Sequence, residues 1–165
     1  HDQPQEDLHD WNLKNVFTRT KSRENAKKRI FSWLYNPNST DAKVDKIYDR
    51  KVLKDMYFDK NLNKVYTQFG REIDSDEDHA ISYIIQSTAA DLVFEQMYKV
   101  WEYLKGKKSF VKFCNHDSLV IDLAEEDQHD INKISKLFSN TRFGKFKINH
   151  EGGKNWSEMK PLNIK

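Results

Sequence analysis

The chain has 165 residues, which is enough to bury one sizeable core or two small ones. A hydrophobic content of 37% and an aromatic content of 13% exclude an intrinsically disordered chain, and no apolar run is long enough to cross a bilayer. The 28 basic and 26 acidic residues leave a net charge of +2, so bulk charge does not indicate a nucleic-acid-binding protein. The single cysteine excludes an internal disulfide and favours a reducing compartment.

Hydrophobic periodicity, capping residues and chain breakers predict helices mixed with short strands. The predicted elements are, in chain order, a loop over 1–10, helices over 11–17, 22–35 and 41–57, a strand over 64–69, a long helix over 79–104, a hairpin over 109–123, a helix over 125–139 and a strand over 145–149. Thr20 or Ser22 can cap the helix over 22–35, and Pro37 stops it. Because the elements show no regular βαβ alternation, we expect an α+β fold.

The helix over 22–35 carries the most distinctive pattern. Arg23, Lys27, Phe31 and Tyr35 recur every four residues, which places them along one helix face, each about 6 Å beyond the last. A phosphate chain could lie along the cationic end while a base or sugar packs on the aromatic end, as in a bound nucleoside triphosphate. The alternative is an amphipathic helix with a solvated basic side and an aromatic core side.

Asp117 is the strongest catalytic candidate. It lies in Asn115-His116-Asp117, between two β-rich runs, so we expect it at the tip of a tight hairpin. A carboxylate there is rigid and exposed, as a Mg²⁺ ligand must be. The alternatives are a plain turn and the His-Asp pair of HD-type phosphohydrolases. Those pairs sit on helices with further His and Asp ligands, whereas the flanks here are strand-like.

Taken together and in order, the motifs resemble the C-terminal part of family A DNA polymerases, the group of bacterial DNA polymerase I and related phage enzymes. The matching elements are Asp7-Leu8-His9, the motif B pattern of Arg23, Lys27, Phe31 and Tyr35, the Thr-x-x-Gly-Arg element at 67–71, Gln86-Ser87-Thr88-Ala89-Ala90-Asp91, the His116-Asp117 of motif C, and Gly153-Lys154-Asn155-Trp156. The resemblance covers nearly the whole chain. It implies an incomplete right-hand polymerase fold, with a helical fingers segment over 1–64 and a palm over 65–165 that holds a small antiparallel sheet.

The resemblance implies roles for residues of the helix over 22–35 and of the Asp7-Leu8-His9 motif. Arg23, Lys27 and His9 would bind the triphosphate of the incoming dNTP, and Lys27 would also donate a proton to the pyrophosphate leaving group. Phe31 would stack against the nucleotide, where some phage relatives have Tyr, so dideoxynucleotides should be incorporated poorly. Tyr35 would guard the templating position.

The resemblance also implies a DNA-binding and a metal-binding set. Arg71, Gln86 and His116 would contact the primer–template, and Asp117 would hold Mg²⁺ as a catalytic carboxylate. Two-metal phosphoryl transfer needs a second carboxylate. Motif A supplies it in the family, and nothing in residues 1–10 matches that motif.

We therefore expect a DNA-directed DNA polymerase fragment or subunit that is inactive alone. Its expected partners are primer–template DNA, dNTP and an N-terminal polymerase part that carries motif A and the thumb, with no membrane. Because the first residue is His1, we expect the chain to begin inside a longer product, located in the cytoplasm, or in the host cytoplasm if a phage encodes it. Ser118 stands where the family usually has Glu, which motivates an alternative: a non-catalytic primer–template or nucleotide-binding module derived from such a polymerase.

Overall fold

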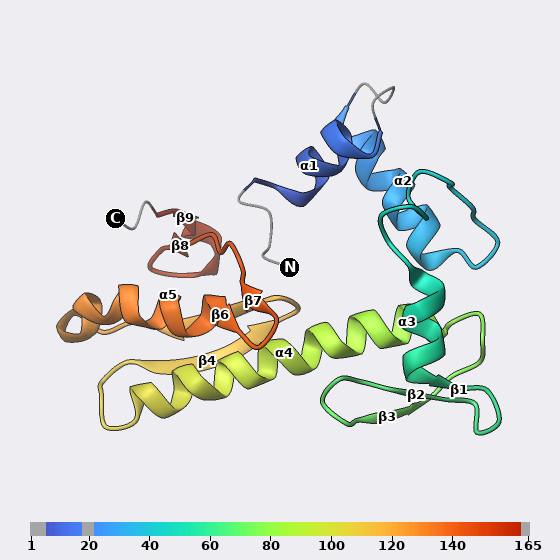
Figure 1. The fold of residues 1–165 in the computed structure, drawn as a ribbon. Coiled ribbons are helices and arrows are strands. Elements are labelled where there is room, and N and C mark those ends of the chain that lie inside the picture. Colours follow the sequence, from blue (N-terminus) through green and yellow to red (C-terminus); the bar gives the residue numbers. More distant parts are fainter. Residues whose placement is uncertain (1–5, 18–21, 163–165) are drawn as a thin grey trace. The chain divides into compact units, whose positions relative to one another are not determined.

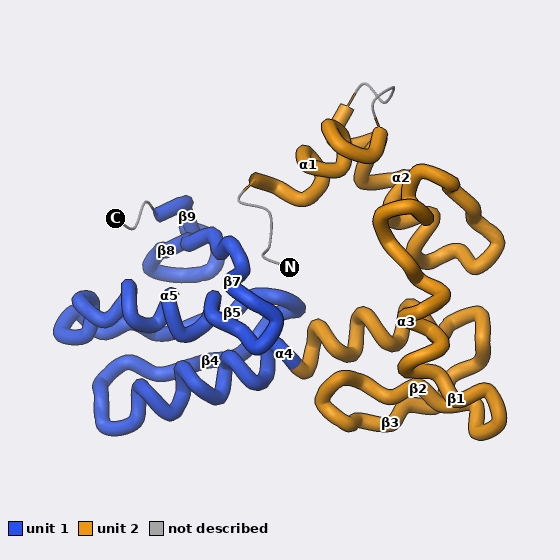
Figure 2. Tube along the Cα trace, viewed as in Figure 1, with its two compact units in different colours: residues 1–3, 92–165 blue, residues 4–91 orange. Residues whose placement is uncertain are grey.

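A computed structural model describes residues 6–17 and 22–162 of the chain (Figure 1). The chain divides into two compact units, one that ends at Asp91 and one that begins at Leu92 (Figure 2). We call them the N-terminal and C-terminal units and describe each by itself. The mixture of helices and small antiparallel sheets confirms the predicted α+β class. The functional division into fingers and palm stays a prediction.

The N-terminal unit begins with two helices, α1 (Leu8–Asn15) and α2 (Arg23–Tyr35). The loop predicted over 1–10 lies outside the described residues up to residue 5 and is wrong over 8–10, because the Asp7 side chain accepts two backbone N–H groups and caps α1 at Leu8. The predicted bounds of α2 are confirmed, with Ser22 as its cap; Thr20 lies outside the described residues. The buried residues of this first core are Val16, Phe17, Ala26, Trp33 and Val44.

The helix predicted over 41–57 is wrong in its first half. Residues 42–47 form turns, and α3 spans only Arg50–Tyr57 after a cap at Asp49. The Asp49 cap starts the helix only at Arg50, and the Arg50 guanidinium ties this start to the last turn of α2 and the loop that follows it. Its acceptors are the backbone carbonyl oxygens of Trp33, Asn36, Pro37 and Ser39.

A three-stranded antiparallel sheet follows, in the order β1-β2-β3. Its strands are β1 (Phe58–Asp59), β2 (Lys64–Tyr66) and β3 (Glu72–Asp74). The strand predicted over 64–69 is therefore shorter than expected, because Thr67 opens a turn that Gly70 closes with a φ of +82°. Val65 of β2 packs with Ala80 and Ile84 of the long helix α4 (Ala80–Leu104) in a second small core.

The C-terminal unit packs the last part of α4 against a hairpin and a further helix. The predicted hairpin is confirmed as β4 (Phe110–Asn115) and β5 (Ser118–Asp122). Its core centres on Val100, Leu104 and Ile134, with Val111, Leu119 and Ile121 of the hairpin packed against them. Within the described residues, none of the helices has the length and apolar character that crossing a bilayer requires.

The rest of this unit is built from short elements. The helix predicted over 125–139 starts as the 3₁₀-helix η1 and continues as α5. The strand predicted over 145–149 is wrong beyond Lys145, because residues 146–150 form no strand and the ladders that flank them on either side are the two-residue pairs β6–β7 and β8–β9. The elements are η1 (Glu125–Asp130), α5 (Ile131–Ser139), β6 (Asn140–Thr141), β7 (Gly144–Lys145), β8 (Glu151–Gly152), η2 (Trp156–Glu158) and β9 (Lys160–Pro161).

Candidate nucleotide and nucleic-acid interface

Four of the five side chains predicted to bind the nucleotide form one connected surface on α1 and α2. The His9 ring meets the Phe31 ring edge-on, with centroids 5.6 Å apart and an angle of 83° between the planes. The Tyr35 ring lies 5.9 Å beyond Phe31, and the Lys27 ammonium lies 5.5 Å from the Phe31 centroid. Phe31 and Tyr35 are 41% and 38% exposed. The aromatic residue of α2 that enters the core is instead Trp33.

The fifth side chain, Arg23, is held by Asp7. Arg23 Nη2 lies 2.7 Å from Asp7 Oδ2, and Arg23 Nε donates to Asp7 Oδ1 at 3.1 Å. This hydrogen-bonded pairing lowers the pKa of the Asp7 carboxyl well below its usual range and raises the pKa of Arg23. Sequence reasoning missed Asp7 as a functional residue; its place in the Asp-Leu-His motif, directly before a helix, was the available signal.

His9 is partly buried beside this ion pair. Burial lowers the pKa of its imidazole below the ordinary value, so the ring is mostly neutral at pH 7. Its Nδ1 atom is buried and has no hydrogen-bond partner among the described residues. An anion bound next to His9 would favour the protonated ring and would therefore raise its pKa.

A second predicted residue, Arg71, is anchored on α4 through a turn. Arg71 Nη2 lies 2.9 Å from Asp91 Oδ1 and donates to the Ser87 carbonyl oxygen at 3.2 Å. Thr67 donates its hydroxyl to Asp91 Oδ2 at 2.8 Å, and the same hydroxyl oxygen accepts the backbone N–H of Arg71. Asp91 thus joins two motifs that lie apart in the sequence, a role that sequence reasoning missed.

Gln86, the other DNA-binding candidate of the N-terminal unit, lies on α4 beside Ser87. Its side-chain amide donates to Ser82 Oγ at 3.0 Å, and the residue is exposed. Arg71 bonds to the carbonyl oxygen of Ser87, the residue that follows Gln86, and both candidate side chains are exposed. A cation and an amide both suit contacts to phosphate and sugar oxygens.

The hairpin tip of the C-terminal unit carries His116 and Asp117. Asn115 pairs with Ser118, which leaves these two residues as the turn, and His116 adopts a left-handed φ of +52°. Ser118 donates its hydroxyl to the Asn115 carbonyl oxygen at 2.8 Å. Asp117 is exposed, and no hydrogen bond or ion pair holds its carboxylate within the described part of the chain. The tip therefore offers one unengaged acid.

The donor set fits a magnesium ion only in part. An exposed carboxylate is the correct ligand type, since Mg²⁺ takes one or two carboxylates together with substrate phosphate oxygens. However, residues 6–17 and 22–162 contain no group of three or more His, Cys, Asp or Glu side chains that could hold a metal ion. Ser118, next to Asp117, presents a hydroxyl that already closes the turn. A two-metal site therefore needs a carboxylate from outside this hairpin.

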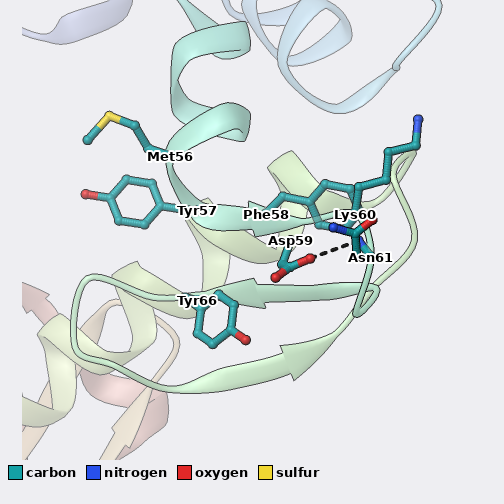
Figure 3. Close-up of a pocket in the computed structure, with 7 residues that line it drawn as sticks. All are labelled: Met56, Tyr57, Phe58, Asp59, Lys60, Asn61 and Tyr66. Carbon is teal, nitrogen blue, oxygen red and sulfur yellow. Dashed lines mark hydrogen bonds between the residues drawn. The ribbon is translucent and has the colours of Figure 1, made fainter.

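Most of the candidate residues are exposed, and His9 and Lys27 are half-buried. A shallow hollow beside β1 contains none of them (Figure 3). Its lining residues are Met56, Tyr57, Phe58, Asp59, Lys60, Asn61 and Tyr66. Asp59 accepts the backbone N–H of Asn61 there at 2.8 Å, an ordinary side-chain-to-backbone turn contact. The helix α2 and the β4–β5 hairpin belong to different units. That Arg23 and Asp117 act on the same nucleotide therefore stays a prediction.

The comparison with known proteins adds an independent observation. No protein-family model matches the sequence. The chain is 31% identical, over 117 residues, to DNA polymerase I of Borreliella burgdorferi. The matched region is 68% of this chain, and it spans 13% of the length of that polymerase. The chain is therefore similar to a small part of DNA polymerase I, and this similarity supports a polymerase-related function.

Proposed function

We propose that this chain is the nucleotide- and primer–template-binding part of a family A DNA polymerase of the phage type, comprising fingers and palm segments. The observation that carries the proposal is the connected surface of His9, Lys27, Phe31 and Tyr35, with Arg23 at its cationic end. From residue 23 to residue 35 this face extends about 18 Å at the helical rise. Similarity to DNA polymerase I supports the same assignment.

On this surface different residues bind different parts of a dNTP. Arg23 and Lys27 neutralise the triphosphate, His9 adds a further contact, and the Phe31 ring stacks against the nucleotide. Tyr35, at the end of α2, guards the templating position. Lys27 is also the proton donor to the leaving pyrophosphate, because an ammonium beside the phosphates can both bind and protonate an oxygen.

The DNA and the reacting phosphate engage the other candidates. Arg71 and Gln86 contact the primer–template backbone, and His116 approaches the primer end from the hairpin. Asp117 is the residue of this chain that would hold magnesium, which when bound stabilises charge on the attacking and leaving oxygens. The second carboxylate is proposed to come from an upstream polymerase part that carries motif A and the thumb, so the chain alone should not extend a primer.

Primer extension tests the assignment. The chain is combined with an upstream polymerase part that carries motif A, and wild type is compared with Asp117→Ala. We expect the extension rate to fall by about 10²-fold or more, because the charge that develops on the reacting phosphate loses its stabilisation. Asp122→Ala is the matched control, since Asp122 is an exposed acid of the same hairpin, paired with Lys112. Unchanged extension by Asp117→Ala would end the assignment.

A specific observation favours a second candidate, a non-catalytic primer–template or nucleotide-binding module. Ser118 supplies no carboxylate, and its hydroxyl is used within the turn. Binding of a labelled primer–template, measured with and without Mg²⁺ and the matching dNTP, separates a polymerase part from a module that binds only DNA. A polymerase part binds DNA more tightly when the correct dNTP is present, whereas a module that binds only DNA shows no dNTP-dependent tightening.

A further inference from the structure

The Asp7 carboxylate joins the two helices of the nucleotide-binding surface. Its Oδ1 atom accepts the backbone N–H groups of His9 at 2.9 Å and Asp10 at 3.1 Å, which is how it caps α1. The same atom accepts Arg23 Nε, and Oδ2 accepts Arg23 Nη2 from α2. One side chain thus fixes the start of α1 and the guanidinium of α2 at the same time.

Two predicted phosphate-binding residues depend on this junction. His9 is the second residue of α1, so its position follows from where the helix begins. Arg23 is the first residue of α2 and is exposed, so its long side chain would otherwise sample many rotamers. Asp7 engages only part of the guanidinium N–H donors, and the rest remain available to a phosphate.

We propose that Asp7 is a positioning residue that orients Arg23 and His9 toward one nucleoside triphosphate. The inference rests on the proposed function, because the ligand is the dNTP assigned to this surface. It assigns Asp7 no contact with the reacting atoms. The negative charge of Asp7 repels a nearby phosphate and so weakens phosphate binding. By holding the Arg23 guanidinium in one orientation before the phosphate binds, Asp7 lowers the entropy cost of binding, which offsets this repulsion.

A matched pair of variants separates positioning from charge. Asp7→Asn keeps a side chain that caps helices well but removes the ionic bonds to Arg23. Asp10→Asn removes an equal charge from the same turn, where Asp10 Oδ1 lies 3.9 Å from Arg23 Nε and makes no hydrogen bond to it. If Asp7 positions Arg23, Asp7→Asn weakens dNTP binding by about tenfold, which is typical when a residue that orients a ligand-binding side chain is removed. Asp10→Asn then leaves dNTP binding unchanged.

Titration calorimetry with dATP measures this difference on the full chain, and circular dichroism checks that α1 remains folded. Equal effects of the two variants would overturn the proposal, because the carboxylate would then act through its charge alone. Tighter binding by both variants would overturn it in the same way. A merely structural role would lower the thermal midpoint of Asp7→Asn while leaving the affinity of the folded chain unchanged.

A second measurement keeps this inference distinct from the proposed function. If wild type does not bind dATP, the proposed function fails, and Asp7 is then tested by NMR titration of His9 in Asp7→Ala. Loss of positioning frees the imidazole from its partly buried place, so the pKa of His9 rises toward its ordinary value. If His9 stays in place, removal of the Asp7 charge lowers the pKa further, and the proposal is wrong.

Discussion

The surface on α1 and α2 and the tip of the β4–β5 hairpin hold their predicted functional side chains in different ways. On the helices each side chain has a side-chain partner: His9 and Lys27 lie against Phe31, and Arg23 bonds to Asp7. At the tip, the Asp117 carboxylate extends from a two-residue turn that the β4–β5 ladder and the Ser118 hydroxyl close, and it has no side-chain partner among the described residues. The difference teaches that side-chain contacts pre-order the groups proposed to bind phosphate, whereas the acid proposed to bind magnesium has no such contact among the described residues.

The physical cause of this difference lies in what each element can bury. The helical surface is backed by a core in which Trp33 is 3% exposed and donates from Nε1 to Asp45 at 2.7 Å. The hairpin buries only one face, against Val100 and Leu104. A two-stranded ladder with one buried face fixes backbone geometry at the tip but provides few side-chain partners there.

The largest expected effect comes from removing the support of the helical surface. Trp33→Ala should destabilise the N-terminal unit by about 3–5 kcal/mol, because it leaves a cavity under α2 and the Asp45 carboxylate without its donor. Trp156→Ala is the comparison from the hairpin's unit, since that ring is 60% exposed and lies on Phe113; we expect a loss below about 1 kcal/mol. Urea denaturation measures both. Similar losses would break the contrast between the two regions.

The next effect concerns ligand binding without metal. Lys27→Ala should weaken binding of dATP in EDTA by about tenfold, because a charge-assisted phosphate contact is lost, whereas Asp117→Asn should leave it unchanged. Lys28→Ala is the control, as its exposed cation neighbours Lys27 on α2. Titration calorimetry is the measurement. Equal weakening by the two lysine variants would mean that only the general positive charge of α2 attracts the nucleotide.

The smallest expected effect is a pH dependence that belongs to the helical surface alone. The pKa of free His9 is lowered by burial, and a bound triphosphate raises it, so binding takes up a proton. Affinity for dATP should therefore rise a few-fold as the pH falls toward the lowered pKa of the free His9 ring. The charges acting on His9 are those of Asp7, Arg23, Lys27 and Glu24. The dependence should vanish in His9→Gln; an affinity that falls at low pH would contradict it.

The sequence by itself determined the features that local rules control. Ser22 and Pro37 mark the ends of α2, the four-residue spacing places its candidate residues on one face, and the β-rich runs around Asn115-His116-Asp117 give the hairpin. These signals lie within a few residues of the structure that they specify, because helix periodicity, capping and tight turns depend on near neighbours.

Only the tertiary structure decided which of these elements support one another. The periodic stretch over 41–57 is helical only from Arg50 onward, and the Arg50 guanidinium bonds to the loop after α2, a contact that no local pattern records. Arg23 is oriented by Asp7, 16 residues away, and Arg71 by Asp91, 20 residues away. Any of several acids could pair with each arginine in sequence; packing brings together the one that does, because ion pairs form between side chains that the fold places within reach.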